Sequence, residues 1–165
     1  MRTPATSRPL WSFFAALVVA TCSLNWLWEM VQMPAYVEMA GRSWSETAFP
    51  CTLAALGDVA VTLGVYGLGA LAAGNWRWGV QGRWNIYLTG ALLGGLVATA
   101  LECRFLASGR WSYNERMPVV PLLGVGLWPL LQLVVLVPIS WAIAAWWTAR
   151  VSDPSDAGGR SAQDG

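Results

Sequence analysis

Three carboxylic acids, Glu29, Asp58 and Glu102, lie inside or close to the long apolar stretches of this chain. An ionised carboxyl group is costly in a membrane interior unless it is paired, hydrated or protonated, so each acid needs a specific reason to be there. A carboxyl group in an apolar site can keep its proton and then donate it, as a general acid does. These residues are therefore the candidate catalytic groups. They are equally suited to binding a ligand without any reaction, so the sequence leaves enzymatic activity open.

Each acid belongs to a polar stripe along its helix, because residues three or four positions apart share a helical face. The stripes are Asn25-Glu29-Gln32, Asp58-Thr62-Tyr66 and Thr99-Glu102-Cys103. Successive spans alternate in direction, so the three acids fall on the same side of the bilayer, with Gln132 of the fourth span at comparable depth. We therefore expect an internal polar cavity open to the outer side. Arg104 is the natural counter-charge, although it faces another side of the helix from Glu102.

The candidate ligand-binding residues are polar and aromatic side chains on these stripes and in the loop that follows the third span. They are Asn25, Trp28, Gln32, Thr62, Tyr66, Arg104, Trp111, Tyr113 and Gln132. Residues 109–118 are polar and aromatic, and they form either a lid over the cavity or an interfacial loop without a chemical role. The alternative for the acids is structural: interhelical hydrogen bonds of about 0.6 kcal/mol each would hold the bundle together, or the acids would reach interfacial water or a dimer contact.

Four apolar runs must position these side chains, at about residues 10–33, 51–73, 86–107 and 127–147. Each is long enough to cross a hydrocarbon core of roughly 30 Å as a helix. With 56% hydrophobic and 12% charged residues, the composition is not that of a soluble domain. We predict an all-α fold with one domain, residues 1–149, made of four transmembrane helices in a compact bundle. The first run continues beyond the length of a signal peptide, so we expect it to be retained.

Three local features are expected around this bundle. Residues 119–126 are expected to form a helical lead-in at the membrane surface, ahead of a fourth span that kinks near Pro138. Residues 150–165 are rich in Ser, Asp and Gly and are expected to form a disordered cytoplasmic tail.

The arginines near the span ends predict the orientation. Five lie in the N-terminal segment, the second loop and the start of the tail, and four lie in the first and third loops. This small bias predicts that both termini are cytoplasmic in a bacterial inner membrane.

Small residues predict how the helices pack. Gly90, Gly94 and Ala98 lie on one face of the third span, and Ala60 and Gly64 have the same spacing on the second. Such faces let two helix backbones approach closely. We therefore expect close contact between the second and third spans. The same faces would also suit a homodimer.

Twelve tryptophans are many for 165 residues, and most of them flank the spans. An aromatic belt at the membrane interfaces explains this placement. The rival interpretation is an aromatic cage around a cationic ligand, for which Trp26, Trp28 and Trp128 are the best candidates.

The remaining residue types exclude several functions. The chain has no histidine, so neither a histidine-containing metal site nor a histidine-activated catalytic cysteine is expected. Cys51 and Cys103 would lie at similar depths and could pair, but packing as small apolar side chains is favoured. A net charge of +1 argues against nucleic-acid binding, and no motif implies a cofactor.

Residues 25–34 and 109–114, together with 124–127, resemble small four-span bacterial membrane proteins usually called hypothetical. The resemblance covers most of the chain and implies no activity. The architecture is also similar to that of emopamil-binding sterol isomerases and their relatives, which place carboxylates and tryptophans in a compact helical bundle. This chain lacks the histidine expected of such an isomerase, so the second likeness is one of architecture.

Three functions fit these features. The first is a pocket for a lipid-like or isoprenoid-like molecule, within the surrounding membrane lipids, with or without acid–base chemistry. The second is a small proton-coupled transporter acting as a homodimer, although acids clustered on one side do not offer access from both sides. The third is a non-catalytic assembly protein in which the polar groups are internal contacts.

Overall fold

The structure is a computed structural model, and it describes residues 10–151. Its elements are α1 (Leu10–Gln32), η1 (Met33–Ala35), η2 (Val37–Met39), α2 (Trp44–Ala72), η3 (Trp78–Gln81), α3 (Trp84–Ala107) and α4 (Leu127–Val151), where η denotes a short 3₁₀ helix. Four helices are long and apolar enough to cross a membrane. These helices pack together and no strand forms among the described residues, which confirms the predicted all-α bundle. The chain is a multi-pass membrane protein.

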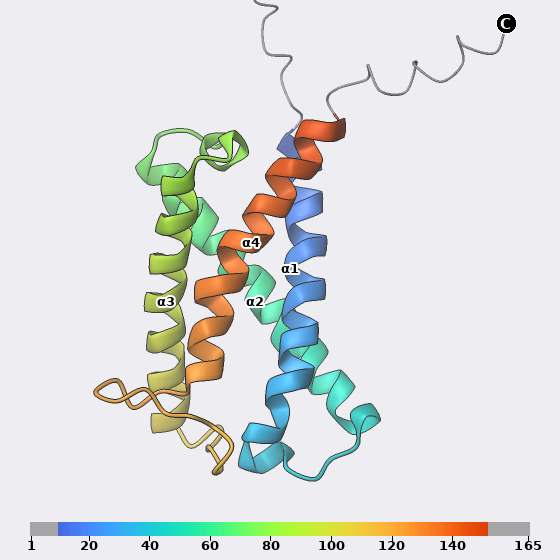
Figure 1. Cartoon of the computed structure of the whole chain (residues 1–165), viewed down its shortest axis with the longest axis vertical. Coiled ribbons are helices and arrows are strands. Elements are labelled where there is room, and N and C mark those ends of the chain that lie inside the picture. The colour runs from blue at the N-terminus through green and yellow to red at the C-terminus, as the bar shows by residue number, and fades with distance from the viewer. Residues whose placement is uncertain (1–9, 152–165) are drawn as a thin grey trace, which may run out of the picture.

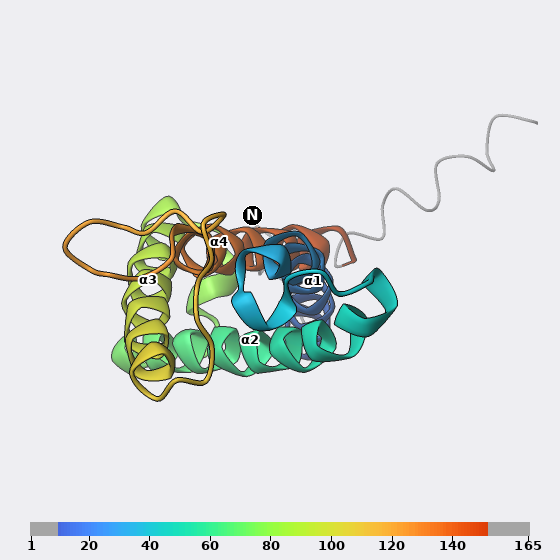
Figure 2. The same ribbon diagram turned by 90° about the horizontal axis from the view of Figure 1, so that it is seen from below.

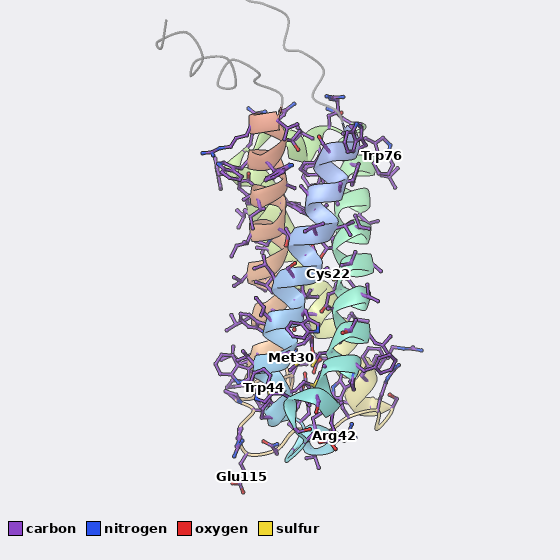
Figure 3. The ribbon with its side chains drawn as sticks, turned by 90° about the vertical axis from the view of Figure 1, so that its right-hand side faces the viewer. Cys22, Met30, Arg42, Trp44, Trp76 and Glu115 are labelled. Carbon is purple, nitrogen blue, oxygen red and sulfur yellow. The ribbon has the colours of Figure 1, made fainter. Side chains whose placement is uncertain are left out.

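The bundle has two different ends (Figure 1). The first described residues of α1, the last residues of α4 and the 73–83 loop lie together, and we call this the terminal end. The two longer loops, residues 33–43 and 108–126, lie at the opposite end, which we call the loop end. Trp76 marks the terminal end, while Arg42, Trp44 and Glu115 lie at the loop end (Figure 3).

Helix α4 holds the bundle together. It packs along both α1 and α3, while α2 packs mainly on α1 and touches α3 only lightly. Helix α2 crosses the other helices obliquely: it lies near α3 at the terminal end and beside α1 at the loop end (Figures 1 and 2). The apolar core fills the terminal half, where Phe13, Tyr66 and Trp141 are fully buried. At the loop end α2 and α3 separate.

The predicted close packing of the second and third spans through small residues is wrong. A Cβ atom added at Gly94 would lie 2.7 Å from the backbone oxygen of Leu133, and one at Gly90 would lie 2.7 Å from the Trp141 ring, so the small face of α3 meets α4. Gly64 has open space around it, and Ala60 is exposed. A small-residue stripe shows where a neighbour approaches closely, but not which neighbour it is.

The helix boundaries differ from the expected ones mainly at α2. This helix begins at Trp44, ahead of the expected residue 51, because Ser43 and Glu46 form a capping box. The Glu46 carboxylate accepts the Ser43 backbone N–H at 2.8 Å, and Ser43 Oγ accepts the Glu46 backbone N–H at 3.4 Å. Helix α4 continues through Pro138 to Val151, beyond the expected end at residue 147. Residues 1–9 and the rest of the expected tail, 152–165, lie outside the described residues.

Residues 119–126 do not form the expected helical lead-in. They turn back on themselves, with an antiparallel bridge between Val119 and Gly126 and a 2.9 Å hydrogen bond from the Val120 backbone N–H to the Val125 oxygen. Proline at 121 disfavours helical geometry in the residue before it, and Gly124 adopts the left-handed conformation with φ 68°. The apolar composition suggested a helix, but the Pro and Gly positions dictate a turn.

The aromatic and cysteine side chains divide between lipid-facing and buried positions. Trp11, Trp44 and Trp84 are exposed near helix ends, as an interfacial belt requires. Trp141 instead packs in the core, against Trp78 and Tyr66. The cysteines Cys22, Cys51 and Cys103 are unpaired; Cys51 is fully buried as a small apolar side chain, whereas Cys103 is exposed on α3.

Gly94→Ala is expected to destabilise the bundle by about 1–3 kcal/mol, because the new methyl group would collide with backbone rather than with a flexible side chain. The free energy of unfolding is measured by titrating sodium dodecyl sulfate into mixed micelles. Gly64→Ala is the matched control and should be neutral or slightly stabilising. Equal behaviour of the two variants would contradict the close α3–α4 contact.

Candidate functional site

A cavity of about 600 Å³ lies at the loop end, where α2 and α3 separate. One wall comes from α2, with Pro50, Leu53, Ala54, Gly57, Asp58 and Val61, and the other from α3, with Ala98, Leu101, Glu102 and Phe105. Helices α1 and α4 supply Glu29, Gln32, Pro129, Gln132 and Leu133. The remaining lining residues, Met33, Tyr36, Glu38, Met39, Arg110 and Trp111, come from η1 and the segments around the two loops. The cavity therefore combines apolar walls with a carboxyl- and amide-lined floor.

Gln132 of α4 is the centre of the polar floor. Its Nε2 donates to Asn25 Oδ1 at 2.9 Å, to Glu29 Oε1 at 2.9 Å and to Asp58 Oδ2 at 2.8 Å. Its Oε1 accepts the Gln32 Nε2–H at 2.8 Å. One carboxamide thus connects α1, α2 and α4. Its two N–H bonds face three acceptors, so the floor offers more acceptors than Gln132 alone can satisfy.

The side chains of α1 support this floor because they follow the helical repeat. Gln32 Nε2 donates to Glu29 Oε1 at 3.0 Å, one turn away, and Asn25 Nδ2 donates to the Thr21 backbone oxygen at 2.8 Å. Trp28 Nε1 donates to Gln32 Oε1 at 3.2 Å from the opposite side. Gln32 is thereby held between the cavity and a smaller groove of about 280 Å³, which Trp28 and Trp128 line. Its amide orientation is fixed by contacts on both sides.

Glu102 has a different partner from the other two acids. The Tyr113 hydroxyl donates to Glu102 Oε2 and accepts the Gly126 backbone N–H at 2.9 Å, so it joins α3 to the start of α4. Burial, together with the hydrogen bond to Glu102, raises the pKa of Tyr113 above its ordinary value. Tyr113 therefore stays a neutral hydroxyl that can donate to the carboxylate. The 108–126 loop is held to α3 through this contact.

The two long loops bond to each other over the cavity. The Val37 backbone N–H donates to the Ser112 oxygen at 3.0 Å, and the Asn114 N–H donates to the Ala35 oxygen at 3.1 Å. Ser112 Oγ also donates to the Glu38 carboxylate at 2.9 Å. Trp111 and Arg110 line the cavity from this side. The loops therefore cover the cavity at the loop end of the bundle, and residues of α2 and α3 line its sides.

The structure brings together six of the residues singled out from the sequence: Glu29, Gln32, Asp58, Glu102, Trp111 and Gln132 all line the cavity. Asn25 and Tyr113 lie behind them and hold them in place. Thr62 is buried one turn beyond Asp58 and does not line the cavity. Trp28 faces the smaller groove.

Two of the expected ligand-binding residues lie elsewhere. Tyr66 belongs to the apolar core at the terminal half, and its hydroxyl donates to the Trp76 backbone oxygen at 2.7 Å. Arg104 is exposed on α3 and makes no ion pair with Glu102 within the described part of the chain. Arg104 lies two positions from Glu102, and successive helical residues are rotated by about a hundred degrees. The two side chains therefore point to different sides of α3.

The apolar wall of the cavity and Arg110 were not among the candidate site residues predicted from the sequence. Ala54 and Val61, four residues before and three after Asp58, share its helical face, so the periodicity around Asp58 contained this part of the signal; Leu53 and Gly57 lie on the adjoining face. Arg110 carries no such signal; its guanidinium lies 4.9 Å from the centre of the Phe105 ring after the chain turns at the end of α3. Residues 10–151 contain no group of three His, Cys, Asp or Glu side chains placed to hold a metal ion.

No protein-family model, curated protein or solved structure matches this chain. The resemblance to small four-span bacterial membrane proteins therefore stays a prediction.

Tyr113→Phe is expected to loosen the 108–126 loop, because it removes one donor to Glu102 and the acceptor of the Gly126 N–H. The local opening free energy should fall by about 1–3 kcal/mol. Hydrogen–deuterium exchange of peptides covering residues 108–126 measures this change. Tyr87→Phe is the matched control, since the Tyr87 hydroxyl has no hydrogen bond within residues 10–151. Unchanged exchange in Tyr113→Phe would show that the hydroxyl does not hold the loop.

Proposed function

We propose that this chain binds a lipid-like or isoprenoid-like amphiphile in the cavity between α2 and α3. The observation that carries the proposal is the combination of an apolar wall with a polar floor in a cavity that the loops cover on the aqueous side. A ligand with an apolar tail and a polar head matches both surfaces. The volume of about 600 Å³ falls within the usual range of small-molecule sites.

The rim of the cavity faces the lipid. Leu53 and Gly57 of α2 line the cavity and are also exposed on the outer surface of the bundle. In a membrane, this surface contacts acyl chains. The ligand therefore reaches the site sideways, from the bilayer, without passing through water.

Binding is better supported than transport. The terminal half contains a packed apolar cluster that includes Phe13, Tyr66 and Trp141, all fully buried. A transporter must expose its acids to both sides in turn, and this cluster separates Asp58 and Glu29 from the terminal end. If a reaction accompanies binding, Asp58 or Glu29 is the group placed to donate a proton to the bound molecule.

Gly57→Phe is expected to block the site while preserving the fold. Gly57 lines the cavity, and a Cβ atom there meets no neighbour within 4 Å, so the phenyl ring can occupy the space of the ligand. Native mass spectrometry of gently purified protein should show a bound small molecule in the wild type and loss of most of it in the variant.

Gly64→Phe is the matched control for this experiment. It lies on the same helix, is exposed, has the same open surroundings and does not line the cavity. This variant should retain the bound molecule. Loss in both variants, or retention in both, would contradict the proposed site.

We also propose that the protein resides in a bacterial inner membrane with the terminal end in the cytoplasm. Arg77, Arg83 and Arg150 lie at the terminal end. The loop end has Arg42, Arg104, Arg110 and Arg116 but also several carboxylates, and the arginine bias that favours this orientation is small. In this orientation, the cavity opens into the outer leaflet.

Cysteine labelling tests the orientation. In a background with the three native cysteines replaced by alanine, Glu115→Cys at the loop end should react with a membrane-impermeant maleimide when the outer membrane is permeabilised. Gln81→Cys in the 73–83 loop should react only after the inner membrane is lysed. The reverse pattern would place the cavity in the inner leaflet.

A further inference from the structure

The acids on the cavity floor have unused hydrogen-bonding capacity. Glu29 and Glu102 are more than nine-tenths buried and line the cavity, and the hydrogen bonds that Glu29 accepts from Gln32 and Gln132 both reach one carboxyl oxygen, Oε1. Asp58 uses only one oxygen, towards Gln132. Buried polar atoms are normally paired, so unpaired ones inside a cavity indicate where a partner belongs. The floor thus presents one oxygen of Glu29 and one of Asp58 as acceptors to whatever occupies the cavity.

No side chain of the described residues neutralises these acids. The partners of Glu29 and Asp58 are the neutral amides of Gln32 and Gln132, and that of Glu102 is the neutral Tyr113 hydroxyl. Arg110 is the basic residue that lines the cavity, and its guanidinium stacks on the Phe105 ring. A carboxylate in so apolar an environment requires a proton or a cation.

The walls beside the acids suit a positive charge. Trp111 packs against Phe105 with ring centres 4.5 Å apart and against Tyr36 at 5.9 Å, and all three side chains line the cavity. Aromatic faces attract cations, most strongly where water is excluded. The Trp111 indole N–H is buried beside the Glu102 carboxyl group. The aromatic groups and the acids therefore surround the same end of the cavity.

We infer that the head group of the ligand is a cationic amine that donates hydrogen bonds to Asp58 and Glu29, while its apolar tail lies between α2 and α3. This inference rests on the proposed function. An amine supplies both the positive charge and the N–H donors that the floor lacks. An anionic head would meet three carboxyl groups, and a neutral alcohol would supply a single O–H donor and no positive charge. The site is thus selective for amino-lipids or other long-chain amines.

The test compares probes that share one tail. Tritiated dodecylamine, dodecanol and dodecanoate are titrated onto the full chain in phosphatidylcholine nanodiscs, with empty nanodiscs subtracted. Dodecylamine should bind at least about tenfold more tightly than either of the others, as expected for a charge-assisted hydrogen bond. Dodecyltrimethylammonium, which has the charge but no N–H, should bind more weakly than dodecylamine.

Substitutions of the cavity acids test whether the preference for the amine arises in the cavity. Asp58→Asn and Glu29→Gln should each weaken dodecylamine binding about tenfold with little effect on dodecanol. Glu115→Gln removes the same charge from an exposed loop position and should change nothing. Thermal unfolding of each variant checks folding, and Glu29→Gln keeps the test open if Asp58→Asn does not fold.

The outcomes separate the two proposals. If all probes bind equally, or the anion binds best, and Gly57→Phe still blocks them, the amine head is overturned and the lipid-like pocket survives. If no probe binds above empty nanodiscs and no molecule co-purifies, the proposed function itself fails. Tight amine binding that persists in both carboxyl variants would also overturn the inference.

Discussion

The Gln132 carboxamide is the contact on which the loop half of this bundle depends. It joins Asn25 and Glu29 of α1 to Asp58 of α2, and Gln32 closes the network from the other side. In a membrane each such bond contributes about 0.6 kcal/mol, so the network stabilises the bundle only modestly. Its larger effect is on geometry, because it fixes the rotation of three helices about one point. Glu29 and Asp58 must then face the same space.

The two halves of the bundle differ in how the space between the helices is filled. In the terminal half, aromatic and aliphatic side chains fill the space between helices, and Trp141 lies against the small face of α3 at Gly90. In the loop half, α2 leaves α3 and no large side chain fills the gap. A soluble protein would fill such a gap with water, but in a membrane it is accessible to apolar chains. The oblique course of α2 therefore produces both the tight core and the cavity.

The polar floor could be predicted from the sequence because it depends on the depth of each residue in the membrane. Span direction and a rise of 1.5 Å per residue bring Glu29, Asp58, Glu102 and Gln132 to one level whatever the helix rotations are. The sequence did not predict features that depend on how each helix is rotated about its axis or on which helix packs beside it. The stripe at Gly90 and Gly94 could serve any neighbour, and the arrangement in space selects α4. The turn at 119–126 was missed because apolar composition was weighted above its Pro and Gly residues.

The burial of three acids without a basic partner requires either a proton on each carboxyl group or a cation beside it. Amides and one phenol satisfy some of the oxygens of Glu29, Asp58 and Glu102, but they carry no charge. Purely structural contacts would be served as well by neutral side chains, since an unpaired buried charge destabilises a fold by several kcal/mol. Carboxyl groups at all three positions, beside the aromatic walls, are what the proposed cationic ligand would pair with, and packing alone does not require them.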